Sequence, residues 1–134
     1  MNPAAATTEI SVLGWSVLLL LVQIVAQTLS LVKDAGLGYA MSPRDANPAI
    51  TDLTKRLTHA LRNFAETYAA FVGLALALVV TGKAGGLGAT GALVWFWARV
   101  IYVPLFAIGV PGLRTAVWTV SIVGLVLMLI RLTT

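Results

Sequence analysis

Cysteine is absent from this chain of 134 residues, which excludes disulfides, cysteine-ligated metals and a protein thiol nucleophile. Any thiol chemistry must therefore come from a substrate. Potential metal ligands are also scarce, because the chain has one histidine, His59, and only five acidic residues. Zinc sites generally need three or four protein ligands. The composition therefore predicts no metal site.

Charged residues make up only 10% of the chain, against about 25% in an ordinary soluble domain. Hydrophobic residues make up 59%, and the mean hydropathy is +0.93. The net charge of +4 comes from nine Lys and Arg that are scattered around apolar runs, so we expect anionic lipid or an anionic ligand as a partner and no nucleic acid. The chain is predicted to be an integral membrane protein.

Four long apolar stretches predict four transmembrane helices, at about residues 10–32, 51–81, 92–110 and 114–131. The first is too long for the apolar core of a cleavable signal, and no Lys or Arg precedes it, so we expect it to be retained. Four spans of about 20 residues use most of the chain. The predicted fold is an all-α bundle of four transmembrane helices in a single domain, residues 1–134.

Lys and Arg are distributed unequally between the two predicted ends of the bundle. The end of the bundle that holds the connection between the first and second helices and the turn between the third and fourth collects five of them: Lys33, Arg44, Lys55, Arg56 and Arg114. The opposite end holds Lys83 and Arg131. Since cytoplasmic loops are enriched in Lys and Arg, both termini are expected to be non-cytoplasmic.

Polar side chains line one face of the second predicted helix. They lie at positions i, i+3, i+4 and i+7, which are neighbours on a helix: His59, Arg62, Asn63 and Glu66. Such a stripe is costly at membrane depth unless it faces the bundle interior or a wet cavity. The simplest alternative to a binding site is an intrahelical Arg62–Glu66 pair, with Asn63 bonded to a neighbouring helix.

A second cation, Arg99, lies within the third predicted helix, which has no carboxylate of its own. Glu9 precedes the first predicted span, so Glu66 alone would face two arginines. An anionic ligand, or sharing of Glu66, would balance this surplus of positive charge. Tyr102 lies one turn after Arg99 and also needs a polar partner at depth. Arg114, at the start of the fourth helix, could be only a flanking charge.

Four segments of the chain are distinctive: RNFAETY at 62–68, ARVIYVPLF at 98–106, GLR at 112–114 and YAMSPRD at 39–45. They resemble the MAPEG family, the membrane-associated proteins in eicosanoid and glutathione metabolism, and YAMSPRD resembles a loop of its small bacterial members. The resemblance covers essentially the whole chain. It implies a homotrimer in the bacterial inner membrane, with glutathione bound near the cytoplasmic side, between the second helix of one subunit and the third helix of the next.

The resemblance also implies roles for individual residues. Asn63, Glu66, Arg99 and Tyr102 would hold glutathione, with Arg62 and His59 beside them, and Arg114 would face the thiol. A nearby guanidinium favours the thiolate form, because positive charge lowers a thiol pKa. The thiolate could then attack a lipophilic electrophile from the bilayer or reduce a lipid hydroperoxide. The implied activity is that of a glutathione-dependent transferase or peroxidase.

Two positions depart from the pattern of the catalytic members. Phe106 stands where those members often have a second tyrosine, and it cannot donate a hydrogen bond. His59 replaces an arginine and can be neutral near pH 7. A non-enzymatic membrane protein, whose polar site binds lipid headgroups or is structural, is therefore the main alternative. A small exporter is a third, although Glu66 lies far from the centre of its span.

Overall fold

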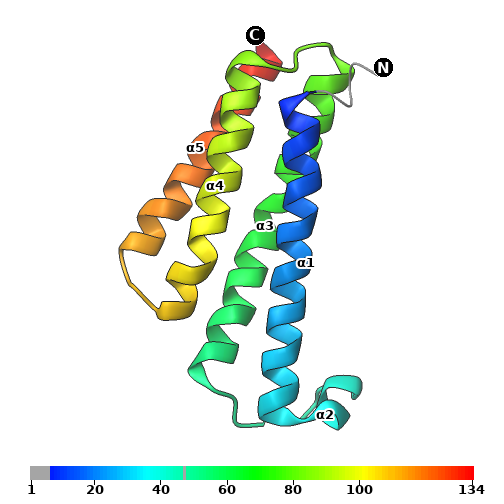
Figure 1. Ribbon diagram of the computed structural model, residues 1–134, viewed down its shortest axis with the longest axis vertical. Coiled ribbons are helices and arrows are strands. Elements are labelled where there is room, and N and C mark those ends of the chain that lie inside the picture. Colours follow the sequence, from blue (N-terminus) through cyan, green and yellow to red (C-terminus); the bar gives the residue numbers. More distant parts are fainter. Residues whose placement is uncertain (1–6, 47) are drawn as a thin grey trace.

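The computed structural model describes residues 7–46 and 48–134, and four long helices dominate them (Figure 1). The elements in chain order are α1 (Thr8–Ala35), α2 (Leu37–Met41), α3 (Asp52–Val80), α4 (Gly86–Ile108) and α5 (Leu113–Thr133). Each long helix is long and apolar enough to cross a membrane. An all-helical architecture with four apolar helices is therefore confirmed.

Two helices begin earlier than the sequence suggested. α1 begins at Thr8, so Glu9 lies in its first turn and is fully buried, whereas we expected it to precede the span. α4 begins at Gly86 and not near residue 92. Because glycine disfavours helix interiors, the glycine-rich residues 81–91 were expected to form a loop. In the structure, Glu9 Oε2 accepts a hydrogen bond of 2.8 Å from the Gly85 amide, at the N-terminus of α4.

α4 and α5 form a hairpin whose backbones come very close together at one point. A Cβ atom added to Gly91 would lie 2.5 Å from the Gly124 carbonyl oxygen, and one added to Gly124 would lie 2.7 Å from the Gly91 oxygen. Small residues permit this kind of approach between membrane helices. We call the end of the bundle that holds this contact and both termini the terminal half.

An aromatic cluster fills the core beside this contact. The Phe71 and Trp95 rings stack with their centroids 3.9 Å apart, and both side chains are fully buried. Phe64 and Tyr68 extend the cluster along α3. The Tyr68 hydroxyl lies 2.9 Å from Ser16 Oγ on α1, so the one polar group of the cluster has a partner. These contacts join α1, α3 and α4.

The opposite end carries the α1–α3 connection and the α4–α5 turn, and we call it the connection half (Figure 1). Here Asp34 on α1 accepts hydrogen bonds from the Thr51 amide at 2.9 Å, the Thr51 hydroxyl at 2.8 Å and the Thr54 hydroxyl. Thr51 itself caps α3 by accepting from the Thr54 amide. These bonds hold α3 against α1 while the α4–α5 hairpin diverges from them.

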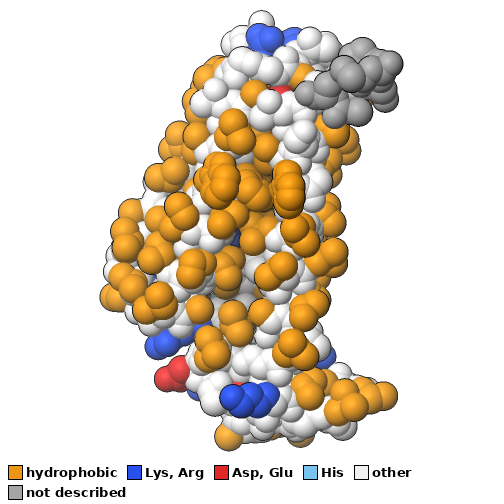
Figure 2. Space-filling model, in the orientation of Figure 1, with side chains coloured by type: hydrophobic (Ala, Val, Ile, Leu, Met, Phe, Trp, Pro, Cys, Tyr) orange, Lys and Arg blue, Asp and Glu red, His pale blue; other side chains and the backbone are white. Residues whose placement is uncertain are grey.

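The surface matches a membrane protein. In the space-filling view, hydrophobic side chains cover the middle of the visible face, and Lys and Arg are concentrated towards the two ends (Figure 2). Many large apolar side chains point outwards; Trp15 and Trp97, for example, are more than half exposed. In water such a surface would be unfavourable, whereas lipid solvates it.

Candidate functional site

Two adjoining cavities open where α3, α4 and α5 diverge in the connection half. The first has a volume of about 240 Å³ and is lined by Asn63, Tyr102, Phe106, Arg114, Thr115 and Trp118. The second has a volume of about 230 Å³ and is lined by His59, Arg62, Asn63, Glu66 and Phe106. Asn63 and Phe106 border both cavities. The polar side chains on one face of α3 therefore border cavities, as their helical spacing predicted.

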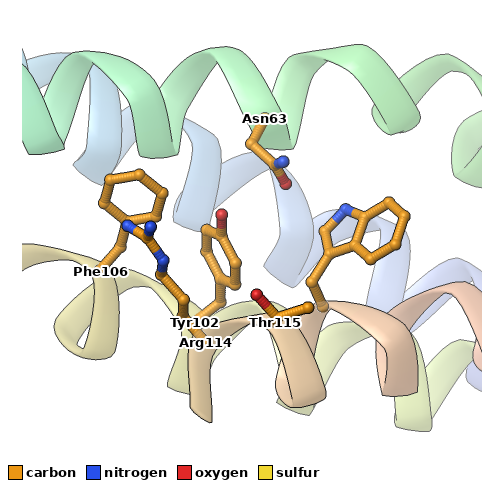
Figure 3. A pocket seen from close by; sticks show the side chains of 6 residues that line it. Asn63, Tyr102, Phe106, Arg114 and Thr115 are labelled. Atoms are coloured by element: carbon orange, nitrogen blue, oxygen red, sulfur yellow. The ribbon is translucent and has the colours of Figure 1, made fainter. Parts of the chain in front are cut away.

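Three helices supply the side chains, and helical spacing explains their convergence. Asn63 points from α3 towards the hydroxyl of Tyr102 on α4, across the first cavity (Figure 3). Tyr102 and Phe106 are four residues apart, so they share one face of α4. Arg114 lies in the first turn of α5 and reaches the same space, because the α4–α5 turn is short. Its side chain is therefore more than a flanking charge.

Arg99 is placed differently from the expectation. Its Nη1 donates a hydrogen bond of 2.8 Å to Asn63 Oδ1, its side chain is fully buried, and it lines neither cavity. Its Nε and Nη2 have no hydrogen-bond partner in the described chain. Arg99 therefore lies behind the residues that line the cavities, and it contacts two of them, Asn63 and Tyr102.

The guanidinium groups of Arg99 on α4 and Arg114 on α5 both pack against aromatic rings. The Arg99 guanidinium carbon lies 4.4 Å from the centroid of the Tyr102 ring and 5.5 Å from that of Phe64. The Arg114 guanidinium carbon lies 4.6 Å from the centroid of the Phe106 ring. A cation over an aromatic face gains about 0.5–2 kcal/mol. Phe106 lacks a hydroxyl group, but it still fixes the position of a charged neighbour.

Arg62 and Glu66 do not neutralise each other. Both side chains are exposed in the protomer, and no hydrogen bond or ion pair joins them in the described residues. The intrahelical pair considered as the simplest alternative is therefore not formed. Two ionisable side chains at this depth are left available for a ligand or for another copy of the chain.

The two walls of the site belong to one chain. The Asn63–Arg99 hydrogen bond joins α3 to α4 within a single protomer, and the expectation that glutathione lies between neighbouring subunits stays a prediction. Thr115 and Trp118 were missed as lining residues. Trp118 lies four residues after Arg114, and this spacing on a helix is the signal that could have found it.

Comparison with known families supports the resemblance found in the sequence motifs. The model of the MAPEG family matches residues 11–134, nearly the whole chain. The chain belongs to the MAPEG family. No curated protein and no solved structure matched it. This MAPEG protein is a multi-pass membrane protein with four spans, and its family suggests a role in glutathione-related or lipid metabolism. Among the described residues, no group of three or more His, Asp or Glu side chains could hold a metal ion.

Proposed function

We propose that this MAPEG protein binds glutathione and acts as a glutathione-dependent transferase on lipophilic electrophiles, or as a peroxidase on lipid hydroperoxides. The observation that carries the proposal is the pair of adjoining polar cavities at the level of the apolar spans. Hydrocarbon does not solvate such side chains, so a polar ligand is the natural occupant. A lipophilic second substrate would reach it from the bilayer.

The charges of the cavities fit glutathione, a tripeptide with two carboxylates and one ammonium group. Arg62 and Arg114 line the cavities, and Glu66 is their one carboxylate in the described chain. Guanidinium groups bind carboxylates well, often through two parallel hydrogen bonds. In this arrangement Arg62 takes a carboxylate, Glu66 takes the amino group, and Asn63, Tyr102 and His59 are available to the peptide.

Arg114 is the residue that we propose acts on the thiol. Its guanidinium is held over the Phe106 ring and lines the first cavity. A positive charge beside the glutathione sulfur would favour the thiolate, which is the nucleophilic form. In the transferase reaction, the sulfur forms a bond to the electrophilic carbon, and the leaving group departs with the electrons of its bond. In the peroxidase reaction, two glutathiones reduce one hydroperoxide to an alcohol and water and become the disulfide.

We also propose a homotrimer in the bacterial inner membrane, with both termini non-cytoplasmic. The exposure of Arg62 and Glu66 supports the assembly, because charged side chains within a span need cover from another protein surface. The two connections on the Lys- and Arg-rich end lie towards the same end of the bundle (Figure 1). The residues that line the cavities belong to that half. Glutathione from the cytoplasm would then have the shorter path to the site.

Turnover by purified protein tests this function. Wild type should conjugate glutathione to an activated aromatic halide or reduce a lipid hydroperoxide, and Arg114→Ala should lower kcat by about 10- to 100-fold, as expected for loss of a charge-stabilising group. Lys55→Ala is the matched control, since Lys55 is an exposed cation outside the cavities. Absence of turnover, or equal kcat in wild type and Arg114→Ala, would sink this mechanism.

A second candidate function is a non-enzymatic membrane protein whose polar site binds lipid headgroups or stabilises the assembly. Phe106 favours it, because the ring offers no hydrogen-bond donor to a reacting group. Calorimetry separates the two candidates: an absence of glutathione binding, together with dissociation of the oligomer in Glu66→Ala, supports the second. Tight glutathione binding with turnover excludes it.

A further inference from the structure

The hydrogen bond between Arg99 and Asn63 determines which way the Asn63 amide points. An asparagine side chain has one acceptor oxygen and an NH₂ group with two donor hydrogens. Here the oxygen, Oδ1, accepts from Arg99 Nη1 at 2.8 Å. Asn63 borders both cavities, whereas Arg99 borders neither. The amide oxygen therefore bonds to Arg99, which does not border the cavities, and the amide nitrogen Nδ2 has no partner in the described residues.

The opposite orientation of the amide is excluded by the chemistry of arginine. A guanidinium has only donors, so rotation of the amide would set N–H groups of both side chains against each other. Arg99 cannot move away easily, because its side chain is fully buried and its guanidinium packs on the Tyr102 and Phe64 rings. The polarity of Asn63 is therefore fixed before any ligand arrives.

We propose that Arg99 is a positioning residue that holds Asn63 as a hydrogen-bond donor towards the cavities, so that Asn63 Nδ2 binds a carboxylate or carbonyl oxygen of the ligand. The identity of that ligand as glutathione rests on the function proposed above. The rival arrangement is direct contact between the ligand and Arg99, whose Nε and Nη2 have no partner. Direct contact requires the ligand to pass beyond the side chains that line the cavities.

A double-mutant cycle distinguishes these arrangements. Glutathione affinity is measured by calorimetry for wild type, Arg99→Met, Asn63→Ala and the double variant. If Arg99 acts through Asn63, each single substitution weakens binding about tenfold, and the double variant binds no more weakly than Asn63→Ala. If Arg99 contacts the ligand itself, the two losses multiply to about a hundredfold, and the proposal is overturned.

Asn63→Asp tests the polarity of the amide without removing the contact to Arg99. The new carboxylate still accepts from Arg99, so the melting temperature should stay at or above that of wild type. It has no N–H donor, so glutathione affinity should fall at least as far as in Asn63→Ala. Wild-type affinity in Asn63→Asp would show that the donor is not used. This variant also decides the question if Arg99→Met does not fold.

If wild type shows no glutathione binding, the function proposed above fails, and this result is distinct from failure of the positioning role of Arg99. Thermal melting of the same four proteins without ligand then tests the positioning contact alone. The expected result is that Arg99→Met lowers the melting temperature less in the Asn63→Ala background than in wild type, because the shared hydrogen bond is already lost. Equal losses in both backgrounds would show that Arg99 does not hold Asn63.

Discussion

The terminal half and the connection half of this bundle are built from the same four helices, yet they are packed in opposite ways. In the terminal half α4 and α5 touch backbone to backbone at Gly91 and Gly124. In the connection half the same two helices help to enclose a cavity of about 240 Å³ between Tyr102 and Arg114. The difference places the tightest helix packing in one half and the cavities of the proposed binding site in the other.

The charged side chains beside the cavities differ from those of the terminal half. In the terminal half they bond to the backbone: Glu9 Oε2 accepts from the Gly85 amide, Lys83 Nζ donates to the Leu132 carbonyl, and Arg131 Nε donates to the Lys83 carbonyl. In the connection half, Arg62 and Glu66 have no such bond within the described chain. These two charged side chains are therefore available to bind a ligand or a second copy of the chain.

The largest effect should come from removing an aromatic ring of the terminal half. Trp95→Ala deletes a fully buried side chain stacked on Phe71, and Phe or Trp to Ala substitutions in cores cost about 3–5 kcal/mol. The free energy of unfolding in detergent micelles is the measurement. Trp97→Ala is the control, because Trp97 lies two residues later on α4 and its side chain is 57% exposed. Equal losses for both variants would contradict a stabilising core at Trp95.

A single methyl group should show how closely α4 and α5 are packed. Gly124→Ala places a Cβ atom 2.7 Å from the Gly91 oxygen and 2.7 Å from the Trp95 nitrogen, which are backbone atoms. Overpacking of this kind costs about 1–3 kcal/mol. Gly73→Ala is the matched control, since a Cβ atom there meets nothing within 4 Å. If both variants melt at the wild-type temperature, the close contact is not a source of stability.

In the connection half, a substitution should change binding and leave stability nearly unchanged. Glu66→Gln keeps the size of the side chain and removes the charge proposed to bind the glutathione amino group. We expect glutathione affinity to fall about tenfold, or 1.4 kcal/mol, in calorimetry. Glu66 is exposed and has no bond within the described chain, so the melting temperature should not change. A lower melting temperature with unchanged affinity would assign Glu66 to structure.

The smallest effect is expected at Phe106, whose ring supports Arg114. Phe106→Leu removes the cation–π contact, which is worth about 0.5–1 kcal/mol at an exposed site, so glutathione affinity should fall about two- to fivefold. Phe106→Tyr keeps the ring and should bind as wild type does. If Phe106→Leu also binds as wild type does, the ring does not position Arg114.

The sequence predicted the helices well because long apolar stretches leave few alternatives to transmembrane helices. It was wrong at residues 86–91, which belong to α4 although their glycines suggested a loop, because Gly91 permits the close approach of α5 that local helix propensity does not reveal. Glu9 was placed outside the span for a related reason: the bond that buries it comes from Gly85, which is 76 residues away. Contacts between distant segments cannot be read from local composition.

Most of the residues that line the cavities were predicted from the sequence, but their arrangement was not. The i, i+3, i+4 and i+7 spacing on α3 placed Asn63 and Glu66 on one face, and both border the cavities. Spacing could not show that Arg99 lies behind Asn63, because this depends on how α3 and α4 pack. Nor could it show that Asn63 bonds to Arg99 of the same chain.

We propose that the connection half of the protein binds glutathione between α3, α4 and α5. A density map of the assembled protein in lipid, determined with saturating glutathione, tests this binding. We expect density for the tripeptide bordered by Asn63, Tyr102 and Arg114, with its sulfur nearest Arg114. Cavities that hold only lipid headgroup density under these conditions would contradict it.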